Sequence, residues 1–76
     1  MLPPPVIRPA VGVTNGVNTT FFTPDGYVSG TLRVWLNGLL MRADYDDGWT
    51  ETGPNKFQMK QAPHVGDVVQ AYYVPG

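Results

Sequence analysis

Short runs in which hydrophobic residues alternate with polar ones recur along the chain, each bounded by Gly, Pro, Asn or Asp. The clearest run covers residues 31–36, where every second side chain points to the same face of an extended strand. One face carries Leu32, Val34 and Leu36, and the other carries Arg33 and Trp35. Asn37-Gly38 follows at once, and both residues tolerate the positive φ of a type I′ turn. The pattern predicts a β-hairpin that returns through residues 39–42.

A second hairpin is predicted from residues 49–52, through a Gly-Pro turn at positions 53–54, to residues 55–60. In its second arm, Phe57 and Met59 alternate with polar residues, which gives one dry face and one wet face. Residues 19–22 are predicted to form a further short strand.

Residues 67–74 form the last predicted strand, and neither of its faces is fully polar. One face carries Val69, Ala71 and Tyr73, and the other carries Val68, Gln70, Tyr72 and Val74. A sheet with one solvated face normally shows a clean alternation of hydrophobic and polar residues. We therefore expect the outer face of this strand to be covered in the working assembly.

Glycine and proline punctuate the whole chain and leave no room for a long helix. Turn-forming pairs recur at roughly the 8–12-residue spacing that is typical of sandwiches and barrels. We predict an all-β fold, a small antiparallel β-sandwich of about six to seven short strands. Residues 11–76 are expected to form it as a single domain.

The beginning of the chain departs from this pattern, and we predict that residues 1–10 form an extended arm outside the sandwich. Three prolines, which favour the polyproline II conformation, precede two apolar residues: Pro3, Pro4, Pro5, Val6 and Ile7. A segment of this kind cannot fold alone. It is either disordered or laid into a groove of a neighbouring protein, so these five residues are predicted to contact a partner.

The size of the chain also indicates a partner. A domain of 76 residues buries only about 60 % of its unfolded surface, so its core provides little stability. Small domains usually add disulfides, a metal or a partner. The chain has no cysteine and one histidine, His64, which excludes disulfides and zinc sites built from Cys and His. We therefore expect a homo-oligomer, or many copies on a symmetric assembly.

The charge content agrees with a largely covered surface. Charged residues are 14 % of the chain, against about 25 % in an ordinary soluble domain. The net charge of −1 provides no attraction for phosphate, so no nucleic-acid partner is expected. No apolar run is long enough to span a membrane, and the N-terminus lacks the features of a secretory signal. We expect a protein that is made and kept in the cytoplasm, or leaves it by cell lysis, and that does not bind membranes.

Candidate chemistry is sparse. The one dense group of carboxylates is Asp44, Asp46, Asp47 and Glu51, which is either a calcium site or a solvated acidic hairpin end. His64 lies in a Pro-His-Val-Gly turn with no nucleophile or orienting acid in a recognisable pattern around it. We predict no catalytic residue, no metal and no cofactor, and no enzyme activity.

The order of the turns and strands resembles a β-module that is common in structural proteins of tailed bacteriophages. The resemblance covers roughly residues 11–75 and rests on segments 13–21, 27–38, 44–45, 50–57, 62–63, 66–69 and 72–74. In such modules a strand, Asn-Gly, strand hairpin precedes a Gly-Asp-x-Val strand that closes a small Ig-like sandwich. These modules occur in tail fibres, tail-tip proteins and head proteins. Residues 46–49 and the proline-rich arm depart from the pattern, so we expect this protein's own contacts there.

Several aromatic residues are candidate contacts beyond the arm. Trp and Tyr are over-represented at protein interfaces, and exposed rings can also stack on sugars. We predict that Trp35, Trp49 and Tyr72 contact a partner. For Trp35, burial against a second sheet or a neighbour is favoured over a sugar platform.

The resemblance implies a structural role in the phage virion. We expect a capsid decoration (cement) protein that stabilises the head by bridging subunits of the major capsid protein. One alternative is a tail, collar or fibre-base component that binds other virion proteins. Another is a carbohydrate-binding module for host attachment, in which Trp49 would touch a host glycan.

Overall fold

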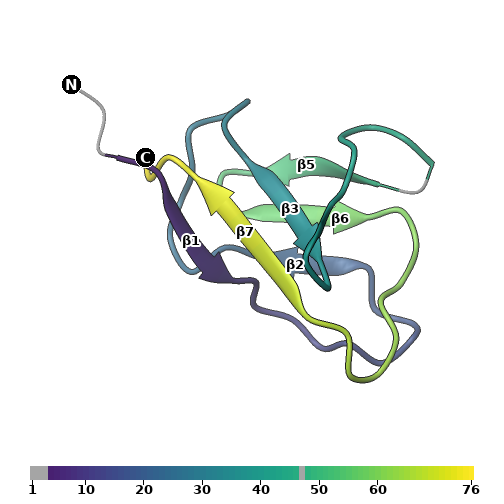
Figure 1. The fold of residues 1–76 in the computed structure, drawn as a ribbon. Helices are drawn as coiled ribbons and strands as arrows, with labels where there is room; N and C mark the ends of the chain where they lie inside the picture. Colours follow the sequence, from purple (N-terminus) through teal and green to yellow (C-terminus); the bar gives the residue numbers. More distant parts are fainter. Residues whose placement is uncertain (1–3, 47) are drawn as a thin grey trace.

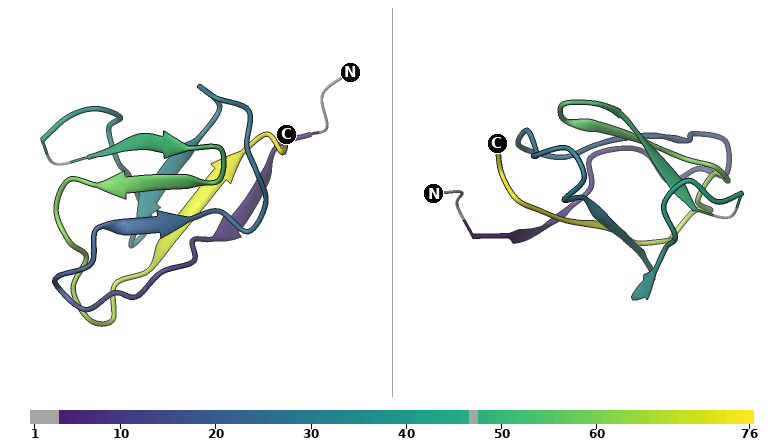
Figure 2. Two further views of the ribbon diagram at one scale, coloured as in Figure 1. Left: turned by 180° about the vertical axis from the view of Figure 1, so that it is seen from behind. Right: turned by 90° about the horizontal axis from the view of Figure 1, so that it is seen from above.

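The computed structural model describes residues 4–46 and 48–76, which form seven β-strands and no helix (Figure 1). The strands are β1 (Val6–Pro9), β2 (Thr20–Phe22), β3 (Arg33–Leu36), β4 (Leu39–Leu40), β5 (Trp49–Gly53), β6 (Lys56–Met59) and β7 (Val69–Tyr73). One sheet has four strands in the order β1-β7-β3-β4, and the other has three in the order β2-β6-β5. All neighbouring strands are antiparallel. Figure 2 shows one sheet behind the other with its strands running obliquely. The prediction of a small antiparallel β-sandwich is confirmed.

Both predicted hairpins are present. β3 and β4 are joined by Asn37 and Gly38, whose φ angles of 52° and 85° are the positive values that a type I′ turn requires. β5 and β6 form the second hairpin, but its turn lies at Pro54-Asn55. It comes one residue later than predicted because Gly53 still pairs with Lys56 across a β-bulge.

The core lies between the inner faces of the two sheets. Its buried hydrophobic residues are Phe21, Tyr27, Leu32, Val34, Trp49, Phe57, Met59, Val69, Ala71 and Tyr73. Aromatic rings dominate it: the ring centroid of Phe57 lies 6.0 Å from that of Phe21 and 6.3 Å from that of Trp49. The predicted dry face of β6 is confirmed, because Phe57 and Met59 are buried. In β7 the structure buries the face that carries Val69, Ala71 and Tyr73.

The beginning of the chain differs from the prediction. Residues 6–9 do not lie outside the sandwich, because they form β1 and pair with β7 along its whole length. The Ala10 N–H donates to the Val69 carbonyl at 3.0 Å, so Val6 and Arg8 occupy the hydrogen-bonded positions of this ladder. At the position of Pro9, a backbone N–H would point away from β7 and form no hydrogen bond in the ladder. An edge strand tolerates proline at such a position. Extended backbone is common to an arm and a strand, and the sequence pattern did not distinguish them.

A tight crossing connects the two sheets between β4 and β5. Residues 42–44 leave the four-stranded sheet and form a parallel bridge with Trp49. The Trp49 N–H donates to the Arg42 carbonyl at 3.2 Å, and the Asp44 N–H donates to the Trp49 carbonyl at 2.6 Å. Gly48 is pressed against this crossing, because a Cβ at that position would lie 1.5 Å from the Arg42 carbonyl oxygen.

Gly48→Ala should lower the free energy of unfolding by about 3 kcal/mol or more, because the backbone must move to admit the methyl group. Gly30→Ala is the control: a Cβ there meets nothing within 4 Å, and only its φ of +87° opposes a side chain. The control should lose only about 1 kcal/mol. Urea unfolding followed by tryptophan fluorescence measures both losses, and equal losses would contradict the close contact at Gly48.

Tyr27 links the two sheets. Its side chain is buried, its ring centroid lies 6.4 Å from that of Tyr73, and its hydroxyl donates to the Lys56 carbonyl at 2.8 Å. Burial, with a smaller effect of the Glu51 charge, raises the pKa of Tyr27 to about 12. Burial also raises the pKa of Tyr73. The fold therefore stabilises both phenols in their neutral form.

Alkaline pH should destabilise the protein through Tyr27. The pKa of Tyr27 is about 12 in the folded state and 10.0 without the fold, so its contribution is complete below pH 10 and is lost as the pH rises through 12. Tyr27→Phe should cost about 1 kcal/mol at neutral pH, because the Lys56 carbonyl loses its donor. The variant should then lose less stability than the wild type between pH 10 and 12. Urea unfolding across this range is the measurement, and parallel losses would contradict the assignment.

Candidate functional site

The outer faces of the two sheets have different chemistry. On the three-stranded sheet, Thr20, Gln58 and Thr50 lie side by side across the three strands. Their side chains point outward, because the neighbouring row, which contains Phe57, points into the core. The next outward pair joins Phe22 to Lys56. This face is therefore polar, with one exposed aromatic residue.

The outer face of the four-stranded sheet is mostly apolar. Strand register aligns two outward rows on it: Ile7, Tyr72 and Arg33 in one row, and Pro9, Gln70, Trp35 and Leu40 in the other. We call these seven residues the apolar outer face. Ile7 is 56 % exposed, Leu40 52 % and Tyr72 36 %. Arg33 is the one charged residue among them.

Trp35 lies near the middle of this face. It pairs with Leu40 on one side and Gln70 on the other, and its side chain is half-buried. Its indole Nε1 is buried and has no hydrogen-bond partner within the described part of the chain. A buried donor without an acceptor costs about 1–3 kcal/mol.

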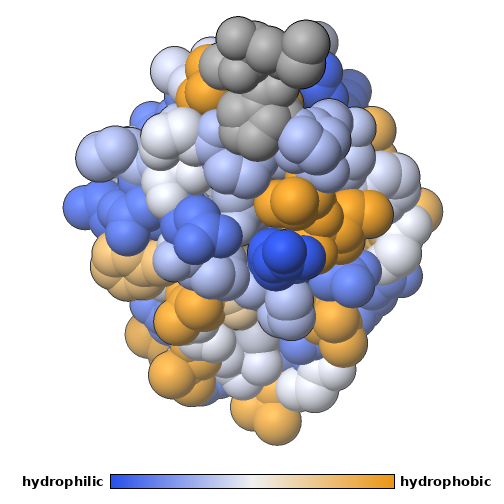
Figure 3. All heavy atoms as spheres, turned by 90° about the vertical axis from the view of Figure 1, so that its left-hand side faces the viewer, coloured by the Kyte–Doolittle hydropathy of each residue, from blue (hydrophilic) through white to orange (hydrophobic). Residues whose placement is uncertain are grey.

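The structure brings together three of the residues predicted to contact a partner: Ile7, Trp35 and Tyr72 all belong to the apolar outer face. Val6 faces the other way and packs against the core. Pro4 and Pro5 are exposed ahead of β1, and Pro3 lies outside the described residues. Figure 3 views the molecule from the side of β1, where hydrophobic patches lie among hydrophilic ones.

The structure contradicts the predicted role of Trp49. It is only 3 % exposed, its ring contacts Phe57, and its indole N–H donates to the Met41 carbonyl at 3.3 Å. The prediction that it contacts a partner is wrong, because the crossing of residues 42–44 folds over it. A residue that follows a run of acidic residues looks exposed in the sequence, and the bridge that buries it is not a local pattern.

Leu40 and Pro9 belong to the face but were not predicted as contacts. The two-residue turn after β3 fixes the pairing of Leu40 with Trp35, so the sequence did contain the signal for Leu40. Pro9 could not be placed, because its position depends on the pairing of β1 with β7.

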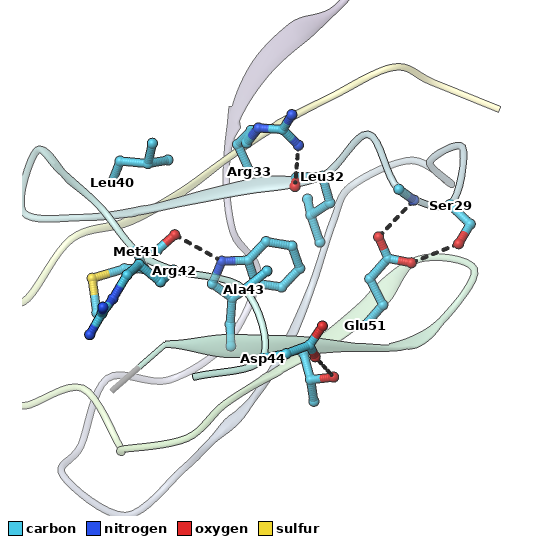
Figure 4. Close-up of a pocket in the computed structure, with 12 residues that line it drawn as sticks. Ser29, Leu32, Arg33, Leu40, Met41, Arg42, Ala43, Asp44 and Glu51 are labelled. Carbon is cyan, nitrogen blue, oxygen red and sulfur yellow. Dashed lines mark hydrogen bonds between the residues drawn. The ribbon is translucent and has the colours of Figure 1, made fainter. Parts of the chain in front are cut away.

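A cavity of about 650 Å³ opens between the sheets beside the crossing (Figure 4). Leu32 and Trp49 contribute buried apolar surface to it, and Arg33, Asp44 and Glu51 are among its polar lining. The Glu51 carboxylate accepts hydrogen bonds from the Ser29 hydroxyl at 2.8 Å and the Gly30 N–H at 2.9 Å. The polar groups at this cavity therefore serve the fold, by tying the 29–30 turn to β5.

The carboxylates of Asp44 and Glu51 do not face a common site. Asp44 accepts from the Thr50 hydroxyl at 2.7 Å, whereas Glu51 holds the 29–30 turn. Asp47 lies outside the described residues. Within residues 4–46 and 48–76, no group of three or more His, Asp or Glu side chains is arranged to hold a metal ion. The acidic side chains at Asp44 and Glu51 act as hydrogen-bond acceptors for neighbouring segments.

His64 is exposed and belongs to a turn that is tied to the β3–β4 hairpin. Its backbone N–H donates to Asp67 at 2.9 Å, and the Asn37 side-chain amide donates to the same carboxylate at 3.0 Å. These two hydrogen bonds, the Asn37 one first, lower the pKa of Asp67. Asn37 also accepts from the Val68 N–H at 2.8 Å, so one residue sets the hairpin turn and fastens a second loop to it.

Compared with protein families, curated proteins and solved structures, the chain matches none of them. The resemblance to phage β-modules therefore stays a prediction. Within the described residues, no helix could cross a membrane.

Two substitutions compare the contribution of the core to stability with that of the apolar outer face. Trp49→Ala should lower the free energy of unfolding by about 3–5 kcal/mol, because it removes a buried aromatic side chain. Ile7→Thr should change it by no more than about 0.5 kcal/mol, because the side chain is exposed and threonine suits a strand. Urea unfolding tests both. A large decrease in the free energy of unfolding for Ile7→Thr would mean that the outer face stabilises the fold. It would contradict the assignment of this face as a surface that is free to bind a partner.

Proposed function

We propose that this chain is a non-catalytic structural component of a tailed-phage virion, which attaches to other virion proteins through the apolar outer face. The observation that carries the proposal is the contrast between the two sheets. Sheets of equal exposure to water would both carry polar outer faces, but only the three-stranded sheet does so. A contiguous apolar patch on a small domain is typical of an interaction site.

The size of the face favours many weak contacts over one tight pair. Four strands about 4.8 Å apart, with about four residues each, present on the order of 300 Å². A stable interface usually buries about 800 Å² on each partner. One copy would therefore bind weakly through this face alone, and a symmetric shell would repeat the contact. This arithmetic supports the capsid decoration role in particular.

A tail, collar or fibre-base component would use the same face, so the position of the face does not separate that role from capsid decoration, and only the small area of the face favours the role with many copies. The carbohydrate alternative is weaker, because burial removes Trp49 as a stacking platform. Tyr45 is exposed, but the Arg42 guanidinium lies 4.2 Å from its ring centroid and occupies one face of that ring.

Tyr72→Glu should weaken attachment at least tenfold, because a charge would be buried against an apolar partner. Phe22→Glu on the opposite sheet is a matched control: Phe22 is 40 % exposed and Tyr72 36 %. Each new carboxylate would also face a cation across its strand pair, Arg33 for Tyr72 and Lys56 for Phe22. Both variants should therefore fold equally well.

The measurement is co-sedimentation of purified chain with phage heads, and separately with tails, prepared from the encoding phage without this protein. We expect Tyr72→Glu to lower the affinity at least tenfold, with Phe22→Glu like the wild type. Unchanged binding of Tyr72→Glu would contradict the assigned face, and no binding of the wild type to either fraction would contradict the virion role.

A further inference from the structure

The backbone pairing with β7 provides most of the contact between β1 and the rest of the molecule. It pairs with β7 alone and forms an edge of the four-stranded sheet (Figure 1). Val6 is half-buried and packs against the core, whereas Ile7, Arg8 and Pro9 are exposed. The strand therefore contributes no fully buried side chain. An edge element of this kind opens at a small free-energy cost relative to the rest of a domain.

A single peptide separates β1 from the fixed body of the sandwich. Ala10 still donates to the Val69 carbonyl of β7. The next residue, Val11, belongs to the other sheet: its N–H donates to the Phe22 carbonyl at 2.7 Å and its carbonyl accepts from the Phe22 N–H at 2.8 Å. Gly12 is fixed as well, since a Cβ there would lie 2.5 Å from the Phe21 ring. The chain thus changes sheets within one residue, and rotation at Ala10 is sufficient to release β1.

The free edge of β1 is closed to further strands. Ile7 and Pro9 are the residues whose backbone groups face away from β7, as the register with Ala10 requires. Pro9 has no N–H to offer, and the Arg8 guanidinium donates to the Ile7 carbonyl at 3.2 Å. Proline and charged residues are the usual protection of an edge strand. Association through this outer edge is therefore disfavoured.

The edge of β7 beneath β1 has the opposite character. Release of β1 exposes the backbone groups of Val69, Ala71 and Tyr73, whose side chains are all buried. An unpaired strand at that position is a template for another extended segment. The segment that fits it in register is β1 itself, and every copy of the chain carries one.

We propose that β1 exchanges between two copies of this chain, so that each β1 pairs with the β7 of the other copy. The exchanged pair keeps every β1–β7 contact of the single copy, and such swaps are a low-cost route to a two-fold dimer. High local concentration, as in a multi-copy assembly, favours the exchanged form. This inference does not depend on the proposed function.

The test uses two single-cysteine variants, Ile7→Cys and Tyr72→Cys, in a chain that has no cysteine of its own. These residues face each other at a position of the ladder without hydrogen bonds, where Cα atoms lie about 4.5 Å apart. That separation is within the range of a disulfide. The two variants are mixed, unfolded and refolded together at increasing concentration, then oxidised. Exchange places Cys at position 7 of one copy beside Cys at position 72 of the other.

The control is a second mixture, Trp35→Cys with Leu40→Cys, which are partners in the β3–β4 hairpin. That hairpin does not exchange, so its mixture reports random collision between surface thiols. We expect the 7–72 heterodimer to rise with concentration and to exceed the control heterodimer at least tenfold on non-reducing gels. A yield equal to the control at every concentration would overturn the exchange. A circular dichroism spectrum like that of the wild type confirms that each variant has folded.

Discussion

Aromatic packing between the two sheets is the interaction on which this small domain depends. The chain has no cysteine, so no disulfide supports a core that closes around Phe21, Phe57 and Trp49. Large rings bury more apolar area per residue than any other side chain, which is how few residues can hold two sheets together. The crossing at residues 42–44 follows from this requirement, because it closes over Trp49 and forces Gly48 to lack a side chain. Tyr27 and Tyr73 extend the same packing and must stay neutral to do so.

The two sheets differ on their outer faces. Ile7, Trp35, Leu40 and Tyr72 share the outer face of the four-stranded sheet, whereas the outer face of the three-stranded sheet is polar apart from Phe22. Trp35, whose buried indole N–H has no hydrogen-bond partner among residues 4–46 and 48–76, belongs to the same face. The β1 edge of the sandwich is protected by Pro9 and Arg8. Attachment through a flat face, together with a protected edge at β1, is the behaviour expected of a module that is repeated on an assembly without forming aggregates.

Local patterns predicted the part of this fold that depends on neighbouring residues. Asn37-Gly38 specified its hairpin because its conformational demand is met within two residues, and the alternation in β6 identified its buried face. The failures have long-range causes. The extended backbone of residues 6–9 was recognised, but its pairing with β7, some sixty residues away, leaves no trace in the local pattern. Trp49 was misassigned for a related reason, since the bridge that covers it joins segments with no regular alternation. The last strand pointed toward the apolar outer face, because neither of its faces is fully polar, but the other residues of that face were only partly predicted. The Ig-like likeness to phage modules stays a prediction.

The central claim is that this chain is a part of the virion in many copies, and its copy number tests that most directly. Quantitative mass spectrometry of purified virions, with heads and tails separated, counts the chain against the major capsid protein. The account predicts hundreds of copies that travel with heads, on the order expected for a site repeated over the shell. A handful of copies that travel with tails would move the same face to a tail or collar position. Absence from both fractions would contradict the structural role.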